Sequence, residues 1–370
     1  MNVNKIVMVV SSASKPNPRV YREAKSLIEH GFNLIIYAWD RECSHPVSEL
    51  NEGIFFEHVQ IKLRHRNLFE FGIGLVMFWL YTFLKVLMQN VSVIHCHDFD
   101  TVPVGILVKL FKPNVKIIYD AHEIYPEMVK AEIPYALYVL LRWIDKVFTR
   151  IADCVIVPSE ERKKFYSGAK RVIVVPNVSK FVDISINRED KKRDFIIFYG
   201  GGLSESTGIL LMIRAVLHIP GVKLVLAGDG PLKSALQKIS KKSDKILYLG
   251  ILPNQKILEN LASADATFVF YSPTNLNNIY SASTKLFEAM MIGIPVIANE
   301  ESVHSSIVRK YNCGIVVPFG DLRAIEDAIL KLKNDNILRE KMGQNGKKAF
   351  RENFSWEHFE ESFINCYKDL

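Results

Sequence analysis

A lysine and a glutamate stand three residues apart in a stretch that is otherwise apolar or small. The stretch is NIYSASTKLFEAMMIGIPVIA, residues 278–298, and the two charges are Lys285 and Glu288. Residues three apart in a helix share one face. Burying charged groups on that face is costly unless something compensates them. The pair therefore predicts a ligand that binds both side chains.

The local sequence predicts a helix that presents this lysine at its positive end. Ser281 or Ser283 can cap a helix that runs to about Met291 and stops at Gly293. Lys285 then lies in the first turn, where the helix dipole disfavours a cation by roughly 0.3 to 1 kcal/mol. A bound anion reverses that effect, and first-turn amides beside a lysine form a phosphate site.

Glu288 lies one turn further along, where its carboxylate can accept hydrogen bonds from two sugar hydroxyls. A phosphate next to a ribose indicates a nucleotide. The alternative is an incidental Lys/Glu pair on a surface helix. The residues that flank Lys285 and Glu288 are too apolar for an exposed face, so the nucleotide interpretation is favoured.

The elements that position this helix alternate between short β-branched runs and segments of helical period. This alternation predicts βαβ units, a mostly parallel sheet and an α/β fold. It breaks at a polar, charged linker, residues 179–193, and then restarts. We predict a Rossmann-like N-terminal domain over 1–178 and a second Rossmann-like domain over 194–352. The segment 353–370 has aromatic residues at helical spacing and predicts a closing helix that crosses back. Ligands of such sheets bind beyond the carboxyl ends of the strands, in the cleft between domains.

Composition and charge narrow the function classes. The chain of 370 residues is 49% hydrophobic and 24% charged, and its net charge is +7. A positive charge suits nucleic acid, an anionic membrane surface or a phosphorylated substrate. No RNA-binding motif or zinc finger is present, which disfavours nucleic acid.

The cysteines and the N-terminus indicate a cytoplasmic protein. The five cysteines are scattered, with no CxxC pair and no histidine cluster at zinc spacing, so we expect free thiols and no structural metal. The sequence MNVNKIVMVV enters a strand directly, without the pattern of a signal peptide.

One long apolar segment, residues 71–88, resists the βαβ pattern because it is apolar on nearly every side. We expect a helix over 68–89 that lies between strands of one sheet, which disfavours a membrane span. Two interpretations remain open. The helix is a buried crossover, or its outer face enters a bilayer while Lys62, Arg64 and Arg66 meet anionic head groups.

Several motifs, taken together and in order, give the chain a family resemblance. The stretch KLFE followed by GIPVIA resembles the C-terminal-domain motif of family 4 glycosyltransferases with the GT-B fold. The segments that resemble other parts of this family cover nearly the whole chain: PRVYREAKSLIEHGF, VIHCHDFDT, YDAHEIYPE, LAGDGPL, LGILP and FSWEHFEESFINCY. The resemblance implies two tandem Rossmann-like domains facing a central cleft. It also implies retaining transfer of a sugar from a nucleotide-diphosphate sugar, with no cofactor and no metal.

The resemblance assigns roles to residues of the C-terminal half. Glu288 would hold the ribose, and Lys285 with the backbone of Leu286 and Phe287 would hold the diphosphate. Gly201 and Gly202 would let the chain approach the phosphates closely. Gly250 and Ile251 would lie beside the base.

In the N-terminal half, His122 of YDAHE matches the family histidine that contacts the donor sugar near the reacting carbon. A lone histidine is often a satisfied core residue, but a position at a strand end between two carboxylates favours the site. We expect Lys15, Arg19, His97 and Asp98 on loops that face the acceptor. The two cations could bind an acceptor phosphate, or they could be solvated.

The sequence departs from the family pattern at the donor site. Tyr280 stands eight residues before Glu288, where the family often has a glutamate that contacts the donor sugar. Thr207 precedes Gly208, where a diphosphate-binding arginine or lysine is usual. The loop SSASKPNPRV also lacks the glycine pair of many relatives. Loss of one such cation weakens leaving-group stabilisation by a few kcal/mol.

These observations predict a hexosyltransferase that uses a nucleotide sugar and a lipid-linked or glycan acceptor for cell-surface polysaccharide. We expect it in the cytoplasm, with possible contact to the inner face of the plasma membrane. One alternative is a weakened or non-catalytic nucleotide-sugar-binding member that acts as a partner subunit. A nucleotide-sugar epimerase is a weaker alternative, because the extra cleft carboxylates that it needs cannot be placed. The sugar, the base and the oligomeric state stay open.

Overall fold

A computed structural model describes residues 5–12, 18–63, 68–184 and 194–370. It divides into two compact units, one of Met1–Pro176 with Glu357–Leu370 and one of Asn177–Trp356. Lys15, Arg64 and Arg66, which the sequence singles out, lie outside the described residues, as does most of the expected linker.

The first unit is built on an eight-stranded sheet in the order β3-β4-β2-β1-β5-β6-β7-β8. Neighbouring strands are parallel except for the antiparallel pair β3 and β4. The strands are β1 (Lys5–Val10), β2 (Asn33–Asp40), β3 (Ser48–Asn51), β4 (Ile54–Gln60), β5 (Val93–His97), β6 (Lys116–Asp120), β7 (Cys154–Val157) and β8 (Val172–Val174).

The sequence pattern did not predict the hairpin of β3 and β4. Its turn, Asn51-Glu52-Gly53, has positive φ at both Glu52 and Gly53 (47° and 85°). These angles fit a type I′ hairpin turn, which Asn-Gly or Asp-Gly usually occupies, so the Glu52-Gly53 dipeptide is only a weak signal in the sequence.

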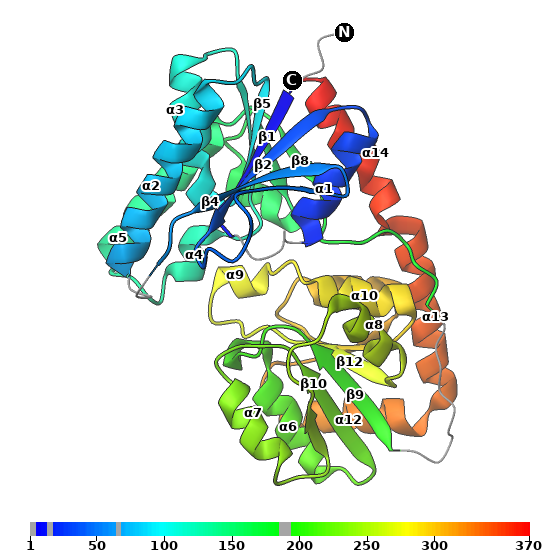
Figure 1. The fold of residues 1–370 in the computed structure, drawn as a ribbon. Helices are drawn as coiled ribbons and strands as arrows, with labels where there is room; N and C mark the ends of the chain where they lie inside the picture. The colour runs from blue at the N-terminus through cyan, green and yellow to red at the C-terminus, as the bar shows by residue number, and fades with distance from the viewer. Residues whose placement is uncertain (1–4, 13–17, 64–67, 185–193) are drawn as a thin grey trace. The chain divides into compact units, whose positions relative to one another are not determined.

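Helices cover both faces of this sheet (Figure 1). On one side α2 and α3 pack together over a core of valine, isoleucine and aromatic side chains, and on the other side lie α1 and α14. The helices are α1 (Pro18–Glu29), α2 (Leu68–Leu87), α3 (Val102–Phe111), α4 (Tyr125–Val129), α5 (Tyr135–Ile151) and α14 (Trp356–Lys368), with 3-10 turns η1 (Phe99–Thr101) and η2 (Glu160–Tyr166).

The long apolar helix α2 is the crossover between β4 and β5, and one of its faces is exposed. Phe78 and Val86 are fully buried on the inner face. The outer face exposes an apolar stripe at helical spacing, formed by Phe69, Ile73, Val76, Met77, Leu80, Leu84 and Met88. Between Phe69 and Leu87 the helix is long and apolar enough to cross a membrane by length and composition alone. We call these seven residues the α2 stripe.

The second unit is a six-stranded parallel sheet in the order β11-β10-β9-β12-β13-β14. Its strands are β9 (Phe195–Gly200), β10 (Val222–Ala227), β11 (Ile246–Tyr248), β12 (Ala266–Val269), β13 (Val296–Asn299) and β14 (Gly314–Val317). Its helical elements are η3 (Glu205–Thr207), α6 (Ile209–His218), α7 (Lys233–Ser240), α8 (Asn254–Ala262), α9 (Leu276–Ile279), α10 (Thr284–Ile292), α11 (His304–Tyr311), α12 (Leu322–Asn334) and α13 (Asn336–Asn353). Two parallel-sheet units confirm the predicted α/β fold class.

Candidate functional site

The second unit places the Lys285/Glu288 helix as the sequence predicted. Helix α10 begins after Ser283, whose hydroxyl accepts a hydrogen bond from the amide of Lys285 at 3.2 Å. It ends at Gly293, which adopts the left-handed conformation at φ 91°. Of the two serines that could cap the helix, the structure therefore uses Ser283.

The helix start decides which backbone amides can meet a ligand. Because α10 begins at Thr284, the amide of Phe287 is the first that can reach a carbonyl four residues earlier, that of Ser283. The amides of Thr284 and Leu286 have no carbonyl within the helix. A ligand at this end would thus meet Thr284 and Leu286 more readily than Phe287.

The side chain of Lys285 lies against the glycine loop that follows β9. A Cβ atom on Gly201 would overlap Cε of Lys285 and would lie 2.8 Å from its Nζ. Gly201 also has φ 148°, a conformation that favours glycine. The ammonium lies 5.1 Å from the centroid of the Tyr199 ring, and the Tyr199 hydroxyl donates to the carbonyl of Gly202 at 2.9 Å. The glycine loop and the first turn of α10 therefore lie in contact, with the Lys285 ammonium between them.

Both charged side chains of α10 are half-buried. Burial opposes the charge on Lys285, but Tyr271, Tyr199 and Glu288 outweigh it and raise its pKa. Burial also raises the pKa of Glu288, and Lys285 opposes that rise. Within the described part of the chain, the Glu288 carboxylate has no hydrogen-bond partner. A ligand hydroxyl would supply one.

The remaining predicted donor residues lie on loops of the same unit. Gly250 has φ 77° and open space where a Cβ would project, and Ile251 beside it is 66% exposed. Gly202 likewise has open space at its Cβ position. Tyr280 is the C-terminal cap of α9, and its amide donates to Leu276 at 3.0 Å.

Thr207 stands where the family usually has a cation. It is buried, and its hydroxyl donates to the carbonyl of Ser204 at 2.7 Å. The next residue, Gly208, has φ 66° and packs so closely on Phe270 that a Cβ would lie 2.7 Å from that ring. Thr207 therefore closes the η3 turn.

In the first unit, His122 is held by carboxylates on both ring nitrogens. Nε2 lies 2.8 Å from Oδ2 of Asp120, and Nδ1 lies 3.3 Å from Oδ2 of Asp98. The backbone amide of His122 also donates to Oδ1 of Asp98 at 3.1 Å. Burial opposes the imidazolium form, but Asp98 and Asp120 outweigh it and raise the pKa of His122 to about 10. His122 is therefore an imidazolium at neutral pH.

The backbone of Asp98 is unusual. It has φ 68° and ψ 165°, which is costly for a residue with a side chain. The side chain that this conformation directs toward His122 makes two contacts with it. Strain of this kind is found where the surrounding structure fixes a functional geometry.

The structure corrects the expectation for Arg19. We predicted an acceptor-facing cation, but the side chain is buried, with Nε and Nη2 on the two oxygens of Asp120 at 2.9 and 2.7 Å. Its Nη1 donates to the carbonyl of Val175 at 2.6 Å, and Nε lies 3.0 Å from Glu23. These contacts occupy all three nitrogens of the guanidinium. Arg19 therefore offsets negative charge of two buried carboxylates, those of Asp120 and Glu23.

His97 is likewise buried and does not face an acceptor loop. Its Nδ1 lies 3.3 Å from both Nε2 of His122 and Oδ2 of Asp120. Burial and the neighbouring His95 lower its pKa well below the usual value, so it is neutral. Of the acceptor residues that we predicted, Asp98 is the one in the described structure that retains substantial exposure, 37% of its side chain.

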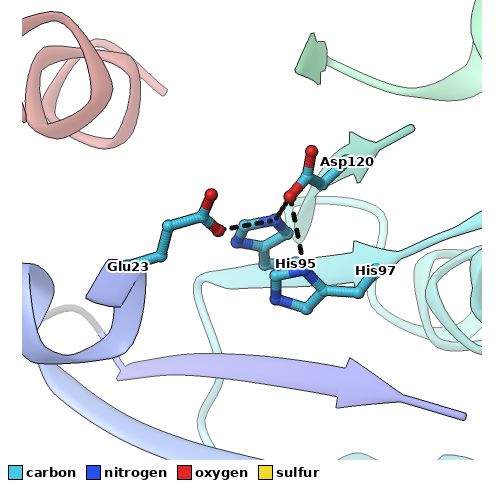
Figure 2. A group of neighbouring side chains, drawn as sticks. All are labelled: Glu23, His95, His97 and Asp120. Atoms are coloured by element: carbon cyan, nitrogen blue, oxygen red, sulfur yellow. Dashed lines mark ion pairs between the residues drawn. The ribbon is translucent and has the colours of Figure 1, made fainter. Parts of the chain in front are cut away.

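Four buried side chains form the cluster in the described structure that could hold a metal ion: Glu23, His95, His97 and Asp120 (Figure 2). Their ligand atoms lie within 4.8 Å of one another. Two imidazoles and two carboxylates are a donor set that suits zinc. However, the Arg19 guanidinium already forms ion pairs with both carboxylates, and a divalent ion would add positive charge beside Arg19 and beside His122. The residues therefore fit an ion-pair network better than a metal centre.

The sequence interpretation missed Glu23, His95 and Asp120 as members of this network. The signals were present, because Arg19 and Glu23 are four residues apart in a predicted helix and His95 and His97 are two apart in a predicted strand. In the structure the two imidazole rings stack with centroids 4.0 Å apart. What periodicity could not show is that α1, β5 and β6 bring the groups together.

Comparisons with known proteins agree with this architecture. Residues 18–178 match the family described as Glycosyltransferase Family 4, and residues 181–349 match the family described as Glycosyl transferases group 1. EpsD, a candidate glycosyltransferase of Bacillus subtilis, is 24% identical over 287 residues, which cover 70% of this chain and 71% of EpsD.

Solved structures share the fold. Sucrose-phosphate synthase from Thermosynechococcus elongatus has a TM-score of 0.82 at 19% identity, covering 99% of this chain and 98% of that one. HepE of Anabaena in complex with UDP has a TM-score of 0.70 at 14% identity, covering 99% and 100%. With both halves matched, the chain belongs to the glycosyltransferases that combine a Family 4 domain with a group 1 domain.

Proposed function

We propose that this glycosyltransferase moves a sugar from a nucleotide-diphosphate sugar to a lipid-linked or glycan-precursor acceptor, with retention at the anomeric carbon. The observation that carries the proposal is the contact between Lys285, in the first turn of α10, and Gly201 of the glycine loop. Together with Gly202, which has open space at its Cβ position, they offer a cation and accessible backbone beside the positive end of a helix, which suits a diphosphate. The complex of HepE with UDP, a protein of the same fold, is in keeping with this ligand class.

The chemistry requires stabilisation of the negative charge that develops on the departing nucleoside diphosphate. The Lys285 ammonium and the amides of Thr284 and Leu286 supply it, since they are fixed before the reaction begins. Glu288 accepts from the ribose hydroxyls and so orients the nucleotide. The leaving phosphate itself can take the proton of the acceptor, which leaves no need for a general base from the chain.

We further propose that the reaction uses no metal ion. Lys285 provides the charge that a divalent cation would otherwise bring to the diphosphate. His122, an imidazolium whose two N–H groups are held by Asp98 and Asp120, is a fixed positive group of the first unit. It is a donor and cannot serve as a general base.

The acceptor end of the proposal rests on the α2 stripe. Seven exposed apolar side chains, six on one face of α2 and Met88 directly after it, form a surface that suits a bilayer. Helix α3 continues it, since Phe111 of α3 contacts Phe83 of α2 with ring centroids 5.4 Å apart, and Leu110 and Phe111 are themselves exposed. Lys62 is exposed just before α2, which favours anionic lipid. We propose a cytoplasmic protein that docks on the inner face of the plasma membrane.

Nucleotide binding tests the donor site. Calorimetry with uridine and guanosine diphosphates should detect binding, and Lys285→Ala should weaken it at least tenfold while weakening binding of the corresponding nucleosides little. Lys256→Ala is the matched control, because this exposed lysine pairs with Glu259 on the surface of the same unit. Equal loss for diphosphate and nucleoside would refute the phosphate role of Lys285.

A turnover assay distinguishes the proposed enzyme from the alternative, a non-catalytic partner subunit. The rate of nucleotide release from several donor sugars is measured with membrane lipid extract as acceptor. We expect Lys285→Ala to lower this rate, as it lowers the affinity for the nucleoside diphosphate. Binding without turnover on any acceptor would favour a non-catalytic partner subunit, for which Thr207 and Tyr280 are the sequence grounds. Absence of nucleotide binding would overturn both.

Membrane docking is tested by flotation with anionic liposomes. The double change Leu80→Glu with Leu84→Glu should abolish flotation, and Ile337→Glu, which alters an even more exposed apolar residue of α13, should not. Replacement of Lys62, Arg64 and Arg66 by glutamine should weaken flotation on anionic vesicles. Flotation that all these variants retain would contradict the docking surface.

A further inference from the structure

Two cysteines that are far apart in sequence meet in the core of the first unit. Cys154 begins β7 and Cys366 lies in α14, 212 positions later, yet their Sγ atoms are 3.0 Å apart. Both side chains are fully buried. The two sulfurs need to approach by about 1 Å to reach the disulfide bond length of roughly 2.05 Å.

We propose that Cys154 and Cys366 form a redox-responsive dithiol, which a hydroperoxide oxidises to a disulfide that ties α14 to β7. The thiols of the other cysteines are not arranged for this reaction, since Cys96 and Cys313 are buried without a neighbouring cysteine and Cys43 is exposed. The proposal is independent of the donor-site assignment.

The surroundings of the two sulfurs determine which one attacks the peroxide and which one then forms the disulfide. The thiol of Cys154 and the guanidinium of Arg171 lower the pKa of Cys366 against the effect of burial. The hydrogen bond to Cys366, followed by burial, raises the pKa of Cys154. Of the two thiols, Cys366 therefore ionises more readily and reacts first, as its thiolate.

The reaction balances in two steps. The Cys366 thiolate attacks one oxygen of hydrogen peroxide and breaks the O–O bond, which gives a sulfenic acid and hydroxide. The Cys154 thiol then attacks the Cys366 sulfur, the S–O bond breaks, and water leaves as the disulfide forms. The two sulfurs lose two electrons in total, and these reduce the peroxide. A thiol reductant reverses the change.

The position of the crosslink gives it a consequence. The chain leaves the first unit at Pro176 and returns at Glu357, so the whole second unit lies between the two cysteines. The hydroxyl of Tyr367, the residue after Cys366, is hydrogen-bonded to Nδ1 of His95 at 2.5 Å, and His95 adjoins Glu23 and Asp120. Oxidation would therefore hold α14 on the network that supports His122.

Local opening of α14 must precede oxidation, because both sulfurs are buried. We therefore expect slow reaction at low temperature and faster reaction near the unfolding midpoint. In a reducing compartment such a disulfide is transient, which is typical of redox sensing.

The test treats the reduced full-length protein with hydrogen peroxide, denatures it in a maleimide, and counts alkylated thiols. We expect five before oxidation and three after it, with peptide mapping that joins Cys154 to Cys366. Amide exchange in α14 should slow at least tenfold in the oxidised protein and recover with dithiothreitol. Cys366→Ser and, independently, Cys154→Ala should abolish both effects, whereas Cys313→Ala, a buried cysteine without a sulfur neighbour, should preserve them.

Three results would overturn the proposal. One is five alkylated thiols after prolonged oxidation near the unfolding midpoint. Another is a crosslink that involves Cys43, and the third is loss of thiols as sulfinic acid on one residue without a linked peptide.

Discussion

Asp98 holds His122 at two points, since one carboxylate oxygen accepts the backbone amide at 3.1 Å and the other lies 3.3 Å from the ring nitrogen Nδ1. Asp120 holds the opposite nitrogen at 2.8 Å. An imidazole between two carboxylates is stabilised in its charged form. The histidine that the sequence identifies thus sits in the structure as a fixed cation.

The first prediction concerns the charge of His122. NMR titration of a ring-labelled sample should show that His122 stays protonated up to a pKa of about 10. Asp98→Asn should lower this pKa by at least one unit, because it removes one of the two charges that stabilise the imidazolium. Deprotonation of His122 near pH 6.5 would contradict the geometry.

The second prediction concerns the stability of the first unit against pH. The folded-state pKa of His122 is raised from 6.5 to about 10. Its contribution is therefore complete below pH 6.5 and is lost as pH rises to about 10. The free energy of unfolding should fall across this window by at most about 1.4 kcal/mol per pH unit from this one proton. Urea unfolding at several pH values measures it, and Asp98→Asn should flatten the slope.

The third prediction concerns Arg19. Arg19→Ala leaves Asp120 and Glu23 buried without the cation that pairs with both, so we expect destabilisation of about 3–5 kcal/mol. The control is Arg309→Ala, which breaks an exposed pair with Glu300 and should cost less than about 1 kcal/mol. Chemical denaturation of both variants measures the change in the free energy of unfolding. Equally small losses of stability in the two variants would argue against the buried network.

The fourth prediction concerns the glycine loop. Gly201→Ala places a Cβ on the Lys285 side chain and also strains the backbone at φ 148°. Displacement of the ammonium should weaken nucleoside diphosphate binding at least tenfold. Gly320→Ala is the control, because it introduces a Cβ at φ 88° in the same unit with nothing within 4 Å. Similar affinity of the two variants for the nucleoside diphosphate would show that the contact between Gly201 and Lys285 does not matter for binding.

A metal assay addresses the buried cluster. If Arg19 is its counter-ion, then zinc added to the purified protein should bind no more tightly to the parent than to Glu23→Gln. Calorimetry with zinc alone measures this. Binding in the parent that Glu23→Gln weakens more than tenfold would assign the cluster of Figure 2 to a metal.

The sequence by itself determined the α/β architecture and the ends of the key helix. Parallel-sheet strands are buried on both faces, so their β-branched runs are readable along the chain. The Ser283 cap and the Gly293 stop are local signals as well, because caps depend on a few neighbouring residues. The hairpin of β3 and β4 was missed because its turn is Glu52-Gly53, which lacks the asparagine or aspartate that usually marks such a turn.

Only the tertiary structure decided which charges are free and which are paired. Arg19 and Asp120 are 101 positions apart, and Cys154 and Cys366 are 212 apart. Such contacts leave no periodic trace in the chain, because they depend on which strands become neighbours in the sheet. For that reason a predicted acceptor-binding arginine proved to be a buried counter-ion. For the same reason, two scattered cysteines proved to be neighbours.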